Sequence, residues 1–321
     1  MHRFILAAAV AAAAVCAPSF AQVQNFPSKS VTLVVPFTAG GGADALVRAA
    51  GRRLSEIWKQ PVVIENLPGA DTIIGTKRVT KAVPDGHTLL VNTPALLFVK
   101  HNHKEEGDLV AELAPVSLLA AGPSVLAASG KSGIKSIADL KATCGKQDAK
   151  CSWGSGDLLT SMIGQSLMAK LGLQDRVVEA RYKGGNAAVA DLVGGHLTLL
   201  VTGTANVSQQ HAAGSARILA LAGDQRVDSL SDVPTYAEAG LGKVDSSQIW
   251  VGVFAPKGTP ESVRRTIAEA LKESLKDTGV VNAMNTMQMR GNGAGPSEFG
   301  EVLKTDEANV TRLMSATPSR N

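Results

Sequence analysis

Three consecutive glycines, Gly40 to Gly42, stand between an apolar run at residues 31–35 and a stretch with helical periodicity. Glycine has no Cβ, so a ligand can approach its backbone closely, and the first amides of a helix have no partner inside that helix. A turn of this composition at the start of a helix is therefore suited to bind an anion. These residues do not decide between two kinds of anion, the pyrophosphate of a dinucleotide and a smaller carboxylate.

The same glycines also satisfy the dinucleotide pattern G-x-G-x-x-A at residues 40–45, and Glu65 follows at about the expected distance. Residues 36–39, however, separate the strand from the first glycine, and the dinucleotide turn has no space for these extra residues. A dinucleotide-binding enzyme that uses the turn at Gly40–Gly42 therefore stays as an alternative from a different class of protein.

Catalytic and metal-binding patterns are weak elsewhere. The chain contains no Gly-x-Ser-x-Gly elbow and no combination of nucleophile, base and oxyanion donor. The run HNHKEE at residues 101–106 offers histidine and glutamate side chains, which are adequate metal ligands, but a solvated polar loop is the simpler interpretation. The sequence therefore predicts no enzyme, no cofactor and no metal site.

The amino terminus predicts export. Arg3 precedes an apolar run from residue 4 to residue 17, and Ser19 and Ala21 suit cleavage by signal peptidase after Ala21. This segment, residues 1–21, is too short to remain as a membrane span. We expect a signal peptide and a periplasmic product, and a periplasmic location gives no ready supply of dinucleotide.

Charge and composition exclude a nucleic-acid partner. The formal net charge of the 321-residue chain is only +4, and 4% of the residues are aromatic, which leaves neither a basic surface nor many rings for base stacking. Hydrophobic residues make up 45% of the chain, enough for the cores of two domains.

Two cysteines follow the expected cleavage site. Cys144 and Cys151 are seven residues apart, and an oxidising periplasm favours a disulfide between them. Two free thiols stay possible, because sequence spacing alone does not fix the distance between the Cα atoms.

Short apolar runs alternate with helical patterns along the chain, which predicts the α/β class with mainly parallel sheets flanked by helices. A helix should begin near Leu46, and others are expected at residues 157–171, 186–193, 261–275 and 297–314. The expected strands cover residues 31–35, 62–66, 87–92, 123–129, 177–182, 197–203, 216–223 and 249–258.

Six motifs occur in order along nearly the whole mature chain. They are FPSKSVTLVVPFTAGGGAD, VVIENLPGA, VPDGHTLL, YKGGNAAVADLVGGHL, DVPTYAEAGL and VGVFAPKGTP. In these motifs the sequence closely resembles the solute-binding proteins of tripartite tricarboxylate transporters, also called the Bug family. The resemblance implies a two-lobed periplasmic binding protein with the Venus-flytrap fold. It also implies a monomer that captures a small carboxylate, such as a dicarboxylate, tricarboxylate, amino acid or aromatic acid, and delivers it to membrane permease subunits. A receptor that senses the ligand and signals would use the same fold and site.

The resemblance also implies which residues contact the ligand. The first glycine-rich turn should hold a ligand carboxylate, partly through ordered water, and the turn at residues 182–186 should face it from the other lobe. Lys183 in that second turn either pairs with the anion or is a solvated loop charge. The expected ligand-binding residues are Phe37, Thr38, Ala39, Gly40, Gly41, Asp44, Asn66, Ser155, Gly156, Tyr182, Gly184, Gly185, Asn186 and Thr204.

Two acidic residues depart from the family pattern. Asp71 replaces a glycine of the motif PGAGG, and Asp157 stands where relatives often have a small hydroxyl residue. Each could recognise an ammonium group of the ligand, or could simply be an exposed side chain or a helix cap.

We expect one lobe to contain residues 26–121 and 249–321 and the other residues 122–248.

Overall fold

The computed structural model describes residues 26–40, 42–182, 184–223, 225–242, 244 and 248–316. The expected signal peptide lies outside these residues, as do Gly41 and Lys183. Within the described part of the chain, no helix is both long enough and apolar enough to cross a membrane.

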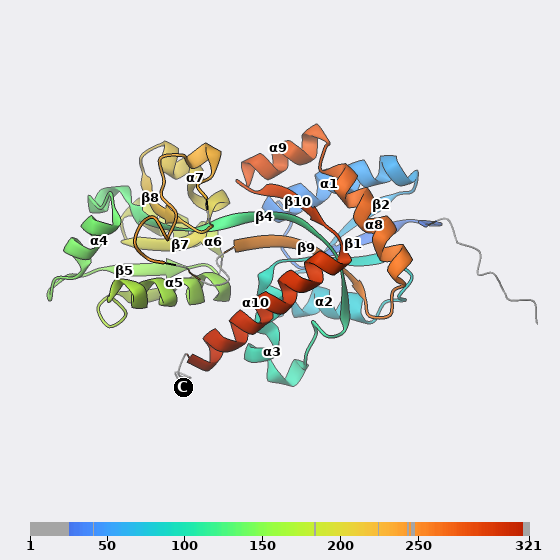
Figure 1. Ribbon diagram of the computed structural model, residues 1–321, viewed down its shortest axis with the longest axis horizontal. Coiled ribbons are helices and arrows are strands. Elements are labelled where there is room, and N and C mark those ends of the chain that lie inside the picture. The colour runs from blue at the N-terminus through green and yellow to red at the C-terminus, as the bar shows by residue number, and fades with distance from the viewer. Residues whose placement is uncertain are drawn as a thin grey trace, which may run out of the picture.

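The first sheet begins with β1 (Val31–Val35), whose valine and leucine side chains are buried at four of five positions. It pairs in parallel with β2 and β3, and the order continues through β9 to the first part of the long strand β4, to which β10 is added. We call the part of the molecule built on this sheet the first lobe (Figure 1). Its strands are β2 (Val62–Asn66), β3 (Thr88–Asn92), β4 (Leu113–Ser129), β9 (Gln248–Pro256) and β10 (Arg290–Ala294).

The second sheet is built on the last part of β4. Residues up to Pro123 pair with β9, whereas residues from Ser124 onward pair with β7 and β8, so β4 passes from one sheet into the other (Figure 1). We call the part built on this second sheet the second lobe. Its other strands are β5 (Ser152–Ser155), β6 (Val178–Arg181), β7 (Leu199–Gly203) and β8 (Ala216–Leu221).

The α/β class and the two-lobed architecture are confirmed, but the sheets are mixed rather than mainly parallel. The pairs β1–β2, β1–β3, β5–β6 and β5–β7 are parallel. All pairs that involve β4 or β9 are antiparallel, because these two strands connect the lobes directly and in opposite directions. Through β4 the strands of both lobes form one hydrogen-bonded order.

Helices cover both faces of the first sheet. The helices on one face bury Leu46, Ile267 and Val280 against Leu33 and Val253 of the strands. The helices are α1 (Gly42–Trp58), α8 (Glu261–Ser274) and α9 (Thr278–Thr286) on this face, and α2 (Ile73–Thr80), η2 (Pro94–Phe98), α3 (Val99–Asn102) and α10 (Pro296–Ala316) on the other, with short turns η1 (Ala70–Thr72) and η3 (Lys104–Glu106).

The second lobe repeats this arrangement. Its core on one face joins Val125 and Leu200 to Ala188, Leu192 and Val207. The helices are α6 (Gly185–Gly194) and α7 (Thr204–Ala212) on this face and α4 (Ile137–Cys144) and α5 (Leu158–Leu171) on the other, with short turns η4 (Gly130–Ser132) and η5 (Asp228–Leu230).

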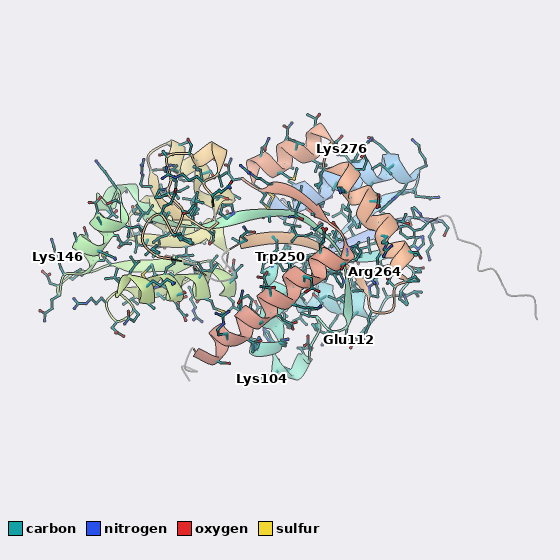
Figure 2. All side chains as sticks on the ribbon, viewed as in Figure 1. Lys104, Glu112, Lys146, Trp250, Arg264 and Lys276 are labelled. Carbon is teal, nitrogen blue, oxygen red and sulfur yellow. A yellow bond between two sulfur atoms is a disulfide. The ribbon has the colours of Figure 1, made fainter. Side chains whose placement is uncertain are left out.

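A third core cluster extends through both lobes. It includes Leu90 and Phe254 of the first sheet together with Trp153 and Leu199 of the second. Trp250 belongs to it and lies under α10, where its indole Nε1 donates to Asp306 Oδ2 at 2.8 Å (Figure 2). The lobes therefore share apolar packing on this face, whereas the helices on the opposite face belong to separate clusters.

Cys144 and Cys151, the residues for which we expected a disulfide, lie at the two ends of a short surface loop between α4 and β5. Their Cα atoms are 5.7 Å apart and their sulfur atoms are bonded at 2.03 Å.

Candidate functional site

The turn between β1 and α1 is organised around the carboxylate of Asp44, which is 3% exposed. Its Oδ2 accepts hydrogen bonds from the Gly40 amide at 2.9 Å and from Arg48 Nε at 2.8 Å. Its Oδ1 accepts from Asn66 Nδ2 at 2.9 Å, and Arg48 Nη2 donates to Asn66 Oδ1 at 2.8 Å. Asp44 therefore supports the turn from below, and the Gly40 amide is occupied by this internal anion.

These contacts fix the charge of Asp44. Burial by itself would raise the pKa of the carboxyl group, but the hydrogen bonds from Arg48, the Gly40 amide and Asn66 outweigh burial and lower it to about 2. The carboxylate thus stays ionised, and the adjacent guanidinium neutralises it. The pair leaves little net charge at the base of the turn.

The outer side of this turn is open. Thr38, Ala39 and Gly40 are exposed, and Phe37 is half-buried with its carbonyl accepting from Asn66 Nδ2 at 3.2 Å. Gly40 has a φ of +86°, and apart from its chain neighbours no described residue has an atom within 4 Å of the place where a Cβ would be. The backbone at this position is therefore accessible from outside.

The neighbouring turn between β2 and α2 holds Asp71 in an unusual conformation. Ala70, Asp71 and Thr72 have φ values of 45°, 49° and 78°, all in the left-handed region that residues with a Cβ rarely adopt. The Asp71 carboxylate lies 2.9 Å from His103 Nε2. The hydrogen bond to Asp71 raises the pKa of His103 and so favours the protonated imidazole beside this carboxylate.

In the second lobe, two glycine turns touch each other. The Gly184 amide donates to the Gly156 carbonyl at 3.0 Å, and a Cβ on Gly156 would lie 2.6 Å from the amide nitrogen of Gly185. A Cβ on Gly185 would in turn lie 2.6 Å from Asn206 Nδ2. The structure thus brings the starts of α5, α6 and α7 together at one edge of the sheet.

Two of the expected ligand-binding side chains are engaged inside the second lobe. Ser155 is buried, and its hydroxyl donates to Glu179 Oε1 at 2.9 Å. The Tyr182 hydroxyl donates to Asp191 Oδ2 at 2.7 Å. Partial burial and this hydrogen bond raise the pKa of Tyr182 to about 12, so the phenol stays neutral. In this conformation both hydroxyl groups form hydrogen bonds inside the second lobe.

The helix starts differ in how their amides are satisfied. Asp157 caps α5, because its Oδ1 accepts from the Thr160 amide at 2.8 Å and the Thr160 hydroxyl completes a capping box. Helices α6 and α7 begin after Gly184 and Gly203, and no side chain among the described residues caps either of them. Desolvation raises the pKa of the Asp157 carboxyl group, and its hydrogen bonds with Thr160 and with the Leu159 amide act in the opposite direction.

Thr204 begins α7 at the junction of the lobes. Its hydroxyl lies 3.5 Å from the carbonyl oxygen of Pro123 on β4 and 3.4 Å from that of Gln288, which follows α9 in the first lobe. Thr204 is 1% exposed, so its side chain contacts the other lobe rather than open solvent.

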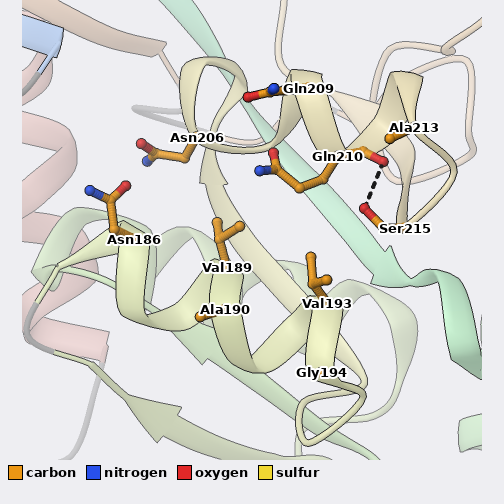
Figure 3. A pocket seen from close by; sticks show the side chains of 10 residues that line it. All are labelled: Asn186, Val189, Ala190, Val193, Gly194, Asn206, Gln209, Gln210, Ala213 and Ser215. Carbon is orange, nitrogen blue, oxygen red and sulfur yellow. Dashed lines mark hydrogen bonds between the residues drawn. The ribbon is translucent and has the colours of Figure 1, made fainter.

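A groove of about 750 Å³ runs between α6 and α7. Asn186 and Asn206 lie at the end nearest the helix starts, and the floor continues along Val189 and Val193 (Figure 3). No residue that lines the groove carries a charge; the others are Ala190, Gly194, Gln209, Gln210, Ala213 and Ser215.

The loop at residues 101–106 does not gather ligands for a metal ion. His103 contacts Asp71 and Glu105, whereas Glu106 pairs with Lys77. Among the described residues, no group of three or more His, Cys, Asp and Glu side chains is arranged to hold a metal.

The expected ligand-binding residues thus form two groups. Phe37, Gly40, Asp44 and Asn66 are joined by hydrogen bonds in the first lobe, whereas Gly156, Gly184 and Gly185 are in contact in the second. Gly41 lies outside the described residues.

Sequence reasoning missed Arg48, Asn206 and Gln288. The spacing of four residues between Asp44 and Arg48 on a helix could have revealed that ion pair. Asn206 and Gln288 contact the site through packing between distant segments, for which the sequence offers no local pattern.

Comparison with known proteins agrees with this architecture. The chain matches the family model described as "Tripartite tricarboxylate transporter family receptor" over residues 46–298. It is 31% identical, over 98% of its length and 94% of the relative, to a UPF0065 protein encoded in the tcbD-tcbE intergenic region of Pseudomonas sp. strain P51.

Solved structures give the same result. The periplasmic binding protein BugD is 28% identical with a TM-score of 0.77, covering 90% of this chain and 98% of that one. The protein Rpa4515 of R. palustris, whose structure contains adipate, is 26% identical with a TM-score of 0.76 over 90% of this chain and 98% of that one.

Fold and relatives together define a two-lobed solute-binding protein of the periplasmic type, which is a receptor and not an enzyme. The chain belongs to the receptor family of tripartite tricarboxylate transporters, which includes the Bug proteins.

Proposed function

We propose that this protein captures a small carboxylate between its lobes in the periplasm and delivers it to the permease subunits of a tripartite tricarboxylate-type transporter. The observation that carries the proposal is that two neighbouring helices of the second lobe begin without a side-chain cap among the described residues. Helices α6 and α7 begin beside each other without side-chain caps, so the amides of their first turns are available to an anion.

The first lobe would supply the other side of the site. Its β1–α1 turn exposes Thr38, Ala39 and Gly40, while the ion pair of Asp44 and Arg48 keeps the turn in place and leaves it nearly neutral. Backbone groups and bridging water can then hold one end of the ligand, and such water contacts are nearly as favourable in enthalpy as direct ones. The adipate in the R. palustris relative supports a dicarboxylate as the first class of ligand to test.

We place the boundary between the lobes at residues 121–122 and 248–249, so that residues 26–121 and 249–321 form one lobe and residues 122–248 the other. The change of partners along β4, from β9 up to Pro123 to β7 and β8 from Ser124, supports this division. The ligand would lie between two parts of the chain that only a few segments connect.

A thermal-shift screen with malate, adipate, citrate, aspartate and glutamate tests the proposal. A ligand that binds only the folded state raises Tm, by an amount that grows with ligand concentration over Kd. Calorimetry on the acid with the largest shift then gives its affinity. No thermal shift with any of these acids would contradict the proposed class of ligand.

The variant Ala187→Asp tests the position of the site. Ala187 is exposed in the first turn of α6, where an added carboxylate should favour the helix but repel a bound anion. We expect affinity for the acid to fall by about tenfold or more, the size of one lost charge-assisted hydrogen bond. Ala138→Asp makes the same change in the first turn of α4 and is the control, since α4 lies at the far end of the second lobe (Figure 1). Equal affinities in both variants would place the anion elsewhere.

A further inference from the structure

Gln288 connects the two lobes by two hydrogen bonds. It lies in the turn between α9 and β10 of the first lobe, and its carbonyl oxygen is 3.4 Å from the hydroxyl of Thr204 at the start of α7. Its side-chain Oε1 accepts a hydrogen bond from the hydroxyl of Ser229 in η5. Both partners belong to the second lobe, so one residue contacts two separate segments across the junction.

The turn that contains Gln288 also packs against β4 where this strand changes sheets. A Cβ on Gly122 would lie 3.0 Å from Met289 Cγ and 3.1 Å from the Gln288 carbonyl oxygen. Thr204 Oγ1, which reaches Gln288, is also 3.5 Å from the Pro123 carbonyl. The contact between Gln288 and Thr204 therefore lies against Gly122 and Pro123, where β4 passes from one lobe to the other.

Gln288 adopts a conformation that its side chain disfavours. Its φ is 51°, in the left-handed region where glycine or asparagine is usual. Residues held in this way persist only where their surroundings determine the conformation, and they concentrate at functional positions. The amide Nε2 of Gln288 donates to the Asn285 carbonyl at 3.0 Å, which fixes the side chain so that Oε1 points to Ser229.

We propose that Gln288 is a positioning residue that ties the second lobe to the first and thereby sets the angle between the lobes before the ligand binds. A receptor whose lobes already hold the binding angle has a larger fraction of binding-competent molecules, and its apparent affinity equals the intrinsic affinity multiplied by that fraction. Only this effect on affinity rests on the proposed function. The effect on lobe geometry can be measured without any ligand.

The variant Gln288→Gly separates this role from simple structural support. Glycine accepts the positive φ without strain, so Tm should stay equal to the wild type or rise. The hydrogen bond to Ser229 is lost, so the angle between the lobes should become less defined even though the fold is at least as stable. A residue that only supported the fold would not give this combination.

Serine variants isolate the side-chain contact. Ser229→Ala removes the hydroxyl that donates to Gln288, whereas Ser229→Thr retains a hydroxyl and should preserve the contact. Ser231→Ala is the matched control, because this exposed serine is two residues away and its hydroxyl forms no hydrogen bond with a described residue.

The measurement is double electron–electron resonance on ligand-free full-length mature protein. Spin labels are attached to Gln174→Cys in the second lobe and Arg265→Cys in the first, both exposed, while the disulfide-bonded cysteines do not react. We expect broader distance distributions in Gln288→Gly and Ser229→Ala, and wild-type distributions in Ser229→Thr and Ser231→Ala. With adipate as the probe, the first two variants should also bind at least about threefold more weakly, if the wild type binds adipate.

Wild-type distributions in both Gln288→Gly and Ser229→Ala would overturn the proposal, and so would equal broadening in Ser231→Ala. If the wild type binds none of the tested acids, the proposed function fails, whereas the distance distributions still decide the role of Gln288.

Discussion

At the scale of single residues, the turn after β1 is held by an anion that belongs to the protein itself. The buried carboxylate of Asp44 accepts hydrogen bonds from the Gly40 amide, Arg48 and Asn66. The glycines and the helix start were readable in the sequence, and so was the spacing of Asp44 and Arg48. The third partner was not, because Asn66 is brought to the turn by the parallel pairing of β1 and β2, in which Val35 aligns with Asn66.

We expect the stability of the protein to depend on the charge of Asp44. Its folded pKa of about 2 lies below the value of 3.8 for an unperturbed aspartate, so ionisation stabilises the fold at every pH above about 4. This contribution disappears as the pH falls from about 4 to about 2. The shift corresponds to about 2 kcal/mol of unfolding free energy.

Asp44→Asn should therefore lower the free energy of unfolding at pH 7 by about 2 kcal/mol, as measured by denaturant titration. The difference from the wild type should shrink when the titration is repeated between pH 4 and pH 2. Asp148→Asn, on the exposed loop that the disulfide closes, should change the free energy by less than about 0.5 kcal/mol. A constant difference at all pH values would mean that the charge of Asp44 is not its source.

Asp157 should oppose a ligand that carries only negative charge. Its carboxylate lies at the start of α5, beside the glycine turns of the proposed site, and a like charge close to a bound carboxylate disfavours binding. Asn is also a good helix cap, so Asp157→Asn should preserve α5. Affinity for adipate, measured by calorimetry at pH 7, should rise about threefold or more.

The pH dependence gives the matching test. Since the pKa of Asp157 is raised, it becomes protonated at a higher pH than an ordinary aspartate, so wild-type affinity for adipate should rise relative to that of Asp157→Asn as the pH is lowered. The difference in affinity between the two proteins should therefore become smaller at lower pH. Weaker binding of aspartate or glutamate to the variant would instead indicate that Asp157 contacts the ammonium group of an amino acid.

At the scale of elements, apolar runs predicted the strands best. The expected ranges 31–35 and 62–66 coincide with β1 and β2, and residues 157–171 contain α5 with its cap. The first part of β4 was missed because Pro115 and Pro123 interrupt its pattern, although the strand continues to Ser129. The strands β5 and β10 are short and rich in glycine and serine, so only their pairing with neighbours defines them.

The contact between the β5–α5 and β6–α6 turns should not tolerate a side chain. A Cβ on Gly156 would lie 2.6 Å from the Gly185 amide nitrogen and 2.8 Å from the Gly184 carbonyl carbon, and both are backbone atoms that cannot rotate away. Gly156→Ala should therefore separate the turns, lower the free energy of unfolding by about 1 to 3 kcal/mol and weaken binding of the identified acid.

Gly300→Ala provides the control for this variant. Gly300 lies inside α10, and the nearest described atom to the position of its Cβ is Pro115 Cγ at 3.8 Å, an ordinary contact distance. Its unfolding free energy should equal that of the wild type or rise by up to about 1 kcal/mol, because alanine favours the helix. Equal stability of the two variants in denaturant titration would show that the turns can move apart without cost.

At the scale of the whole molecule, the two lobes are less independent than the sequence suggested. We expected one lobe to end at residue 121 and the other to begin at residue 122, but β4 runs through this junction as one strand and pairs with β9 as far as Pro123. Leu90 and Phe254 of one lobe share a buried cluster with Trp153 and Leu199 of the other. Periodicity shows which face of an element is buried, but it does not show which other element covers that face.

This shared cluster predicts that the lobes unfold together. A core that extends through both lobes cannot lose its packing in one lobe without exposing apolar surface in the other. Differential scanning calorimetry should therefore show one transition in which the calorimetric and van't Hoff enthalpies agree.

Phe98→Ala in η2, where the side chain is 1% exposed within this cluster, should lower the free energy of unfolding by about 3 to 5 kcal/mol and move the whole transition to lower temperature. Val83→Ala, at a side chain that is 69% exposed, should leave the transition in place. Two resolved transitions, with only one of them shifted by Phe98→Ala, would show that each lobe folds around its own core.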